Sequence, residues 1–436
     1  MITIQNAPAS FTPAGNPIIF QLTSDNSNIV YFQVQVVQVP SNQTIINQKF
    51  YVRPDYPNGV SFNLSSILSN LVETKVNNSP NVLAAAIDDA SVSYRLIITE
   101  KINDNGVVIS GAVYNVPTDN YTVWNAKFDR LLFTVYNQNE YVVNGSYTCK
   151  FLSLKEQISK QSATSTEHLY FINNGLAAKA RIRLYNIAGV QVANYIANLP
   201  AGNVIRLNVS PKTLYNLYGA DFTNIGHYRV DLLDGFDNVV SQEKVYLFGG
   251  YPCHLQPVNL LWTNSLGGVE SFTLFNPIES IAVAKTKLKT NPLQLDNGVY
   301  SDHSNGIINP TEKLISSSSE STFKIFSDVL TDEETIMLKE LITSENVYLE
   351  LSDNQTLLPI NIKETNYDVL LRRTNGYKLN RLNISYSTQS GFIPSKSDLF
   401  GSGVGSASIQ FINMPVPPTY NNGVVYHNAS NGTVNL

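Results

Sequence analysis

The segment Leu260–Asn276, LLWTNSLGGVESFTLFN, constrains the fold more than any other stretch of the chain. Its first residues, through Trp262, are apolar and favour a strand, and Val269–Phe275 has the aromatic and aliphatic residues of a second strand. Asn264–Gly268 between them has turn chemistry, because glycine adopts positive φ without strain. The segment predicts a β-hairpin whose tryptophan packs across the pair or against a neighbouring sheet. Any all-β protein could contain such a hairpin, so its structural and functional role has to be inferred from the rest of the chain.

The composition favours β-structure with a sparsely charged surface. Tyrosine and phenylalanine number 24 and 19 against 3 methionines, and aromatic residues are enriched in strands. Charged residues make up only 14% of the 436 residues, against roughly 25% in an average soluble protein. Such a surface suits secreted proteins, adhesins and virion parts. The net charge of −5, without a Lys/Arg cluster, argues against a nucleic-acid partner.

Cysteine usage and apolar runs bear on compartment and membrane association. Cys149 and Cys253 are too few for a disulfide framework. The start, MITIQNAPASF, has no basic stretch followed by an apolar one, so we expect no signal peptide. No apolar run approaches the roughly 20 residues that a membrane-spanning helix needs. We therefore expect a chain made in a cytoplasm, without a membrane span.

Short strands separated by turn residues divide the chain into three predicted units and an arm. Residues 1–119 contain roughly seven such strands and predict a β-sandwich. Residues 120–257 repeat the pattern and predict a second immunoglobulin-like sandwich. Residues 258–394 open on the hairpin and predict an α+β domain, with one helix on an antiparallel sheet. Residues 395–436 are rich in Gly, Ser, Pro and Asn, and predict an extended or flexible arm that orders only against a partner.

Local signals within these units predict one clear helix and two irregular stretches. Thr331 can cap a helix whose first turn, Asp332–Glu334, suits the positive helix end. Its apolar face is predicted to comprise Ile336, Leu338, Leu341 and Ile342. Lys155–Glu167 is polar without a hydrophobic period and predicts a loop. Ile307–Ser321, which contains a serine run, predicts either the end of a long hairpin or a mobile loop.

Motifs for catalysis, metals and phosphate are weak. The best metal candidate, Cys253-His254 with the distant His303, offers two adjacent ligands and a remote one, unlike a zinc site. The aspartates of residues 231–238 lack the spacing of a calcium loop, and an Asp-Gly hairpin explains them better. The GSGVGS of residues 401–406 lacks the Lys-Ser/Thr of a phosphate-binding loop. We therefore predict no catalytic residue, no metal and no cofactor.

The order of these features carries a resemblance. The chain opens on FTPAGNPIIFQLTSDN, continues through TVWNAKFDRLLF, and places a W-x-N-x-x-G-G-x-(D/E)-x-F pattern before a closing helix-and-strand unit. This succession resembles tail-associated structural proteins of phages and prophages of Bacteroidetes-type bacteria. It covers roughly residues 9–394, with Glu270 at a position where aspartate is usual. The pattern falls on Trp262, Asn264, Gly267, Gly268, Glu270 and Phe272.

The resemblance implies a non-enzymatic structural protein of a phage virion. It would be a tail, tail-hub or ring component that forms homo-oligomers, docks other virion proteins or fibres, and serves host attachment after synthesis in the host cytoplasm. A terminal arm could add a strand to the open sheet edge of a neighbour. Two alternatives remain: a head-decoration protein, or a receptor-recognition adhesin that stacks Tyr or Trp on a host surface glycan. A glycan depolymerase would need paired carboxylates, which can lie far apart along a chain.

Overall fold

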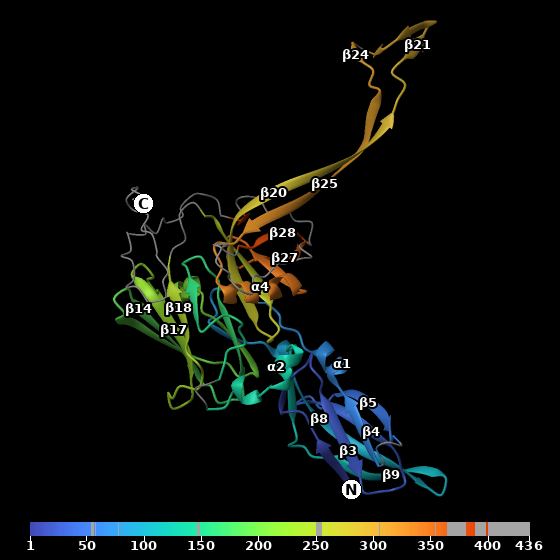
Figure 1. The fold of residues 1–436 in the computed structure, drawn as a ribbon, viewed down its shortest axis with the longest axis vertical. Coiled ribbons are helices and arrows are strands. Elements are labelled where there is room, and N and C mark those ends of the chain that lie inside the picture. The colour runs from blue at the N-terminus through green and yellow to red at the C-terminus, as the bar shows by residue number, and fades with distance from the viewer. Residues whose placement is uncertain are drawn as a thin grey trace, which may run out of the picture.

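A computed structural model shows three successive β units and a long two-stranded ribbon that projects away from them (Figure 1). The predicted fold class, mainly β with serial sandwiches and a final α+β unit, is confirmed. Most of the predicted C-terminal arm (395–436), Cys253, His254 and residues 401–406 lie outside the described residues. The structure describes residues 1–53, 56, 58–76, 78–145, 149–249, 255–304, 306–353, 355–363, 381–388 and 398–399.

The first unit is a sandwich of two sheets around one core. Alternation in the sequence sets the faces: Phe32, Val34 and Val36 are buried, whereas Gln33 and Gln35 between them are half-buried. The smaller sheet has the order β1 (Ile2–Asn6), β3 (Ile19–Ser24), β6 (Gly59–Asn63). The larger has the order β2 (Phe11–Pro13), β10 (Tyr121–Trp124), β8 (Ser91–Asp104), β4 (Ile29–Val39), β5 (Thr44–Tyr51), with β9 (Val107–Asn115) also on β8. Two helical turns follow β6, α1 (Ser65–Leu68) and η1 (Ser69–Leu71).

The second unit is also a sandwich. One sheet has the order β11 (Val142–Val143), β13 (His168–Asn173), β16 (Val204–Asn208), β7 (Ala84–Ala86). The other has the order β12 (Ile158–Gln161), β18 (Lys244–Phe248), β17 (Ile225–Leu233), β14 (Lys179–Asn186), β15 (Gln191–Asn198). The helical segments between first and second units and within the second are η2 (Asp88–Ala90), α2 (Arg130–Thr134), η3 (Gln138–Glu140) and α3 (Pro211–Tyr218).

The sheets of the first two units depart from the sequence-based expectations in two places. The predicted loop 155–167 contains β12, which pairs in parallel with β18. As an edge strand it needs little apolar burial, so its sequence shows no hydrophobic period. Strands also cross the predicted boundary near residue 120: β10 joins the sheet of the first unit, and β7 of the first unit joins a sheet of the second.

The third unit is a closed antiparallel barrel that holds helix α4 (Asp332–Thr343) against its core. The predicted helix start is confirmed, because Thr331 and Glu334 form a capping box. Met337, Leu338 and Leu341 are buried, but Ile336 lies on the other side of the helix and is 54% exposed. The strand order is β19 (Pro257–Thr263), β20 (Val269–Lys289), β25 (Glu312–Phe326), β28 (Asn383–Thr388), β27 (Leu357–Ile362), β26 (Val347–Glu350).

Strands β20 and β25 continue beyond the barrel as the projecting ribbon, defined here as residues 278–322 (Figure 1). The serine run Ser316–Ser319 lies within β25, so the long-hairpin alternative for this stretch is the correct one. The register shifts between Phe275 and Ile278, where Asn276 has a positive φ of 53°, and this irregularity marks where the ribbon leaves the barrel. The ribbon tip carries two small hairpins, β21 (Gln294–Asp296) with β22 (Val299–Ser301), and β23 (His303–Ser304) with β24 (Ile307–Ile308).

Candidate functional site

The predicted hairpin is present, and its turn lies where the three units meet. Strands β19 and β20 pair with Thr263 opposite Val269, so Asn264–Gly268 forms the turn. Gly267 has a φ of +91°, which L side chains rarely adopt. The surrounding apolar cluster draws on all three units, with Trp124, Tyr170 and Leu261 buried together. We call Asn264–Gly268 the junction turn.

The side chain of Asn264 shapes the junction turn. Its Oδ1 accepts hydrogen bonds from the backbone N–H groups of Leu266 at 3.1 Å and Gly268 at 2.8 Å. Its Nδ2 donates to the carbonyl oxygen of Leu152 at 2.9 Å and to Oε1 of Glu270 at 3.0 Å. A single buried amide therefore folds the turn and ties it to the second unit.

The junction turn also bonds to the first unit through its own carbonyl groups. The indole Nε1 of Trp124 donates to the carbonyl of Leu266 at 2.9 Å. The hydroxyl of Thr74 donates to the carbonyl of Gly267 at 3.0 Å. Because these donors and acceptors are buried, each bond gives a partner to polar groups that would otherwise be unsatisfied.

The two glycines are required by close backbone approach. A Cβ on Gly267 would lie 2.4 Å from the carbonyl oxygen of Asn125, in the first unit. A Cβ on Gly268 would lie 2.2 Å from the carbonyl oxygen of Leu152, in the second. Real Cβ atoms do not approach backbone oxygens so closely, so these positions accept only glycine without a shift of neighbouring backbone.

Glu270 connects the hairpin to a buried polar network. Its Oε1 accepts the backbone N–H of Leu154 at 2.6 Å, and burial raises its pKa, partly offset by Lys155. Lys155 forms an ion pair with Glu167, whose Oε1 accepts the hydroxyl of Tyr246 at 3.1 Å. The carboxylates of Glu167 and Glu270 thus accept hydrogen bonds from groups that belong to the buried framework of the fold.

The other two pattern residues face the third unit. Trp262 is 0% exposed and lies in the barrel core, where its indole Nε1 finds no partner among the described residues. Phe272 is half-buried and packs against the same core. Trp262 is therefore a packing residue, as the sequence indicates, and Phe272 is the one pattern residue that reaches an open surface.

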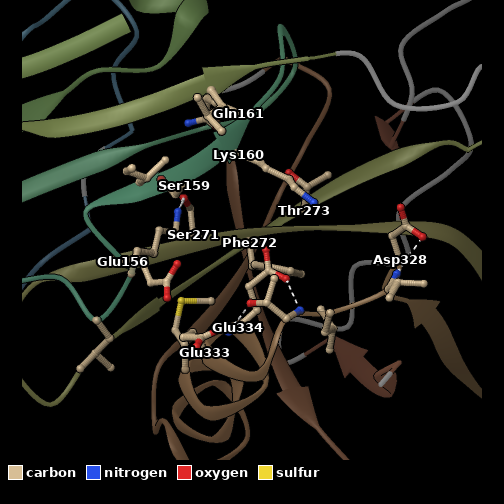
Figure 2. A pocket seen from close by; sticks show the side chains of 18 of the residues that line it. Glu156, Ser159, Lys160, Gln161, Ser271, Phe272, Thr273, Asp328, Glu333 and Glu334 are labelled. Atoms are coloured by element: carbon tan, nitrogen blue, oxygen red, sulfur yellow. Dashed lines mark hydrogen bonds between the residues drawn. The ribbon is translucent and has the colours of Figure 1, made fainter. Parts of the chain in front are cut away.

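That surface is a groove of about 230 Å³ between the second and third units (Figure 2). Strand β12, residues 271–275 of β20, the loop 328–330 and the first turn of α4 line it. Its apolar wall includes Phe272, Val329 and Met337. Three exposed carboxylates surround it, those of Glu156, Asp328 and Glu333. We call it the junction groove.

No local sequence pattern indicates this groove. Glu333 has a simple explanation as a residue that favours the positive helix end, and Glu156 falls in a stretch expected to be a loop. Only the pairing of β12 with β18 and the packing of α4 beside β20 bring the two carboxylates to one cavity.

The ribbon is the second candidate surface, because almost every described side chain on it is exposed. Its shaft exposes Ile281, Val283, Leu288, Leu314 and Ile315. Its tip exposes Leu295, Val299, Tyr300, Ile307 and Ile308. Outside the barrel, β20 and β25 pair only with each other within the described chain, so each has a bare outer edge.

The weaker motifs gain little from the structure. Within the described ranges, no cluster of three or more His, Cys, Asp or Glu side chains is placed to hold a metal. Asp234 accepts the backbone N–H groups of Phe236 at 2.8 Å and Asn238 at 2.9 Å, in agreement with a hairpin turn. The thiol of Cys149 is buried, which raises its pKa to about 12. None of the described helices has the length and hydropathy of a bilayer span.

Comparisons with known proteins give no family. No family model matches the chain, and no curated protein matches it. Similar solved structures include native alpha-2-macroglobulin of E. coli, with 7% identity over 74% of this chain and 21% of that chain, at a TM-score of 0.16. Its trypsin-activated form has 6% identity over 84% and 25%, at a TM-score of 0.17. A complex of Dpr11 IG1 with DIP-gamma has 9% identity over 55% and 92%, at a TM-score of 0.16.

The chain spans a quarter or less of the two macroglobulin chains. At TM-scores this low, none of these likenesses bears on function. The proposals below rest on the geometry of the junction turn, the junction groove and the ribbon.

Proposed function

We propose that this chain is a non-enzymatic structural protein of a phage virion, a multimeric tail, tail-hub or ring component that docks neighbouring virion proteins or fibres. The observation that carries the proposal is the ribbon. A two-stranded ribbon is at best marginally stable alone in water, and aliphatic side chains in such number on a projecting element mark an interaction surface. Assembly would cover both the apolar side chains and the bare strand edges.

The junction turn supports a structural role. Three units that share one buried turn form a stiff body, because each unit contributes groups to the hydrogen bonds of that turn. The buried carboxylates there accept bonds from backbone and side-chain donors that hold the fold, rather than from groups facing a cavity. A stiff body with one long projection suits a repeated part of a particle.

Microscopy and mass spectrometry test this proposal together. We expect negative-stain images of the purified chain, alone or mixed with other tail proteins, to show rings or other closed multimers. Mass spectrometry of purified particles should find its peptides. A chain that stays monomeric in every mixture, and is absent from the particles, overturns the proposal.

One observation favours a second candidate, a receptor-recognition protein that binds a host surface glycan. Tyr300 at the ribbon tip is 71% exposed, and an exposed tyrosine face can stack on a sugar ring. Glycan-array binding that Tyr300→Ala abolishes would support it. Equal binding by the wild type and Tyr300→Ala, or no binding by either, rules out the tip as the site.

A further inference from the structure

The distal half of the ribbon shaft, residues 285–289 and 312–317, combines positive charge with apolar surface. It contains four lysines and a single glutamate, Glu312, which pairs with Lys287 at 2.9 Å. Between these lysines lie Leu288, Leu314 and Ile315, each more than half exposed. Lys287 lies opposite Leu314, and Leu288 lies opposite Lys313, so each face of the shaft carries an aliphatic side chain beside a lysine.

The junction groove has the opposite character. Its wall is apolar, and its exposed acidic side chains outnumber its one exposed lysine, Lys160. Its floor includes β12, an edge strand with one bare side in the described sheet. The carbonyls of Gln157 and Gln161 accept hydrogen bonds from backbone N–H groups of the β18 segment. Backbone groups alternate in direction along a strand, so the N–H and C=O groups of Ile158 and Lys160 point to the opposite, bare side of β12. The groove thus offers carboxylates, an apolar wall and a strand edge together.

A ribbon cannot reach the groove of its own chain. Residues 271–275 of β20 line the groove, and Lys285 lies ten residues further along the same extended strand, about 33 Å away at roughly 3.3 Å per residue. The two surfaces can meet only if they belong to different copies. Such a contact joins two different faces, so it repeats from copy to copy and closes into a ring or continues as a filament.

We propose that the distal ribbon shaft of one copy lies in the junction groove of the next copy, with its lysines facing Glu156, Asp328 and Glu333. The aliphatic side chains of the shaft cover the apolar wall, and its bare edge can pair with β12 by strand addition. This inference rests on the proposed multimeric function and names the partner as a second copy of the chain. The carboxylates specify the register, and burial of the aliphatic side chains supplies affinity.

Reciprocal charge reversal tests the contact. The ribbon variant is Lys285→Glu/Lys289→Glu/Lys313→Glu, which leaves the Lys287–Glu312 pair intact. The groove variant is Glu156→Lys/Asp328→Lys/Glu333→Lys. Lys49→Glu and Glu345→Lys, at exposed positions outside both surfaces, serve as single-reversal controls. Circular dichroism checks that all variants fold, and sedimentation velocity over a concentration series measures their assembly.

We expect each triple variant alone to need at least ten times the wild-type concentration to assemble, because like charges then face each other. An equimolar mixture should assemble like the wild type, since each reversed surface finds its complement on the other variant. The controls should match the wild type.

Wild-type assembly by the triple variants, or failure of their mixture to assemble, overturns the ribbon–groove contact and leaves a multimeric structural role intact. A wild-type chain that is monomeric at every concentration also overturns the contact. Only its absence from purified particles as well removes the proposed function.

Discussion

Asn264 and Glu270 hold one stretch of backbone between them. Asn264 donates to the carbonyl of Leu152 at 2.9 Å, and Glu270 accepts the N–H of Leu154 at 2.6 Å, while the two side chains bond to each other at 3.0 Å. Two side chains that lie six residues apart in the hairpin thus bind backbone groups that lie two residues apart in the second unit. This relationship explains the N-x-x-G-G-x-E part of the pattern as a junction between units.

Asn264→Ala should lower the free energy of unfolding by about 2 kcal/mol or more. The change leaves the N–H groups of Leu266 and Gly268 and the carbonyl of Leu152 without their buried partner, and each such group costs about 1–3 kcal/mol. Urea denaturation followed by circular dichroism measures the loss. A loss below about 0.5 kcal/mol would show that water replaces the amide.

Gly268→Ala should destabilise the chain by about 1–3 kcal/mol, because its Cβ would meet a backbone oxygen that cannot rotate away. Gly235→Ala is the control, since a Cβ there has open space and should change stability by less than about 0.5 kcal/mol. Thermal unfolding of both variants side by side gives the comparison. Equal melting temperatures would contradict the close contact with Leu152.

Trp262→Ala should cost about 3–5 kcal/mol, because it removes a fully buried side chain from the barrel core. Hydrogen exchange of the α4 amides reports this loss locally, since α4 packs in the same core. Phe236→Ala, at a side chain that is 89% exposed, should leave exchange unchanged. Unaltered α4 protection in Trp262→Ala would place the tryptophan outside the core.

His168 should make stability depend on pH below neutrality. Burial, followed by the nearby Arg206 and Lys155, holds its pKa well below the usual 6.5. The unfolded chain therefore gains a proton below pH 6.5 that the folded chain does not, and stability falls as pH falls. One such proton contributes at most about 1.4 kcal/mol per pH unit.

His168→Phe removes this proton and should flatten the decline between pH 6.5 and pH 5. The comparison uses urea midpoints of wild type and variant across that range. Parallel curves would show that His168 takes up its proton in the folded state, in contrast to the depressed pKa.

Features set by neighbours in sequence were predictable. The capping pair Thr331 and Glu334 lies three residues apart, and the turn residues of the hairpin are adjacent, so local rules suffice. The burial of Trp262 could also be predicted from the sequence, because an aromatic residue in a short strand has a strong tendency to pack in the core.

Features set by distant pairings were not predictable. Thr74 and Gly267 bond across 193 residues, and no local pattern indicates that a first-unit loop touches the hairpin turn. Strand β12 is visible only through its pairing with β18, and the closure of the last sheet into a barrel depends on β19 meeting β26. The groove is formed by these pairings. Each of its carboxylates therefore has a local explanation in the sequence, but their position around one cavity could not be predicted.

The continuity of β20 has a mechanical consequence. One strand, β20, runs from the junction turn through the barrel wall and along the ribbon shaft as far as Lys289. Tension on the ribbon therefore travels along covalent backbone to the turn, and it loads the β19–β20 ladder in shear, with all its hydrogen bonds strained at once. A force applied to the ribbon is therefore transmitted to the junction turn, the point that all three units share.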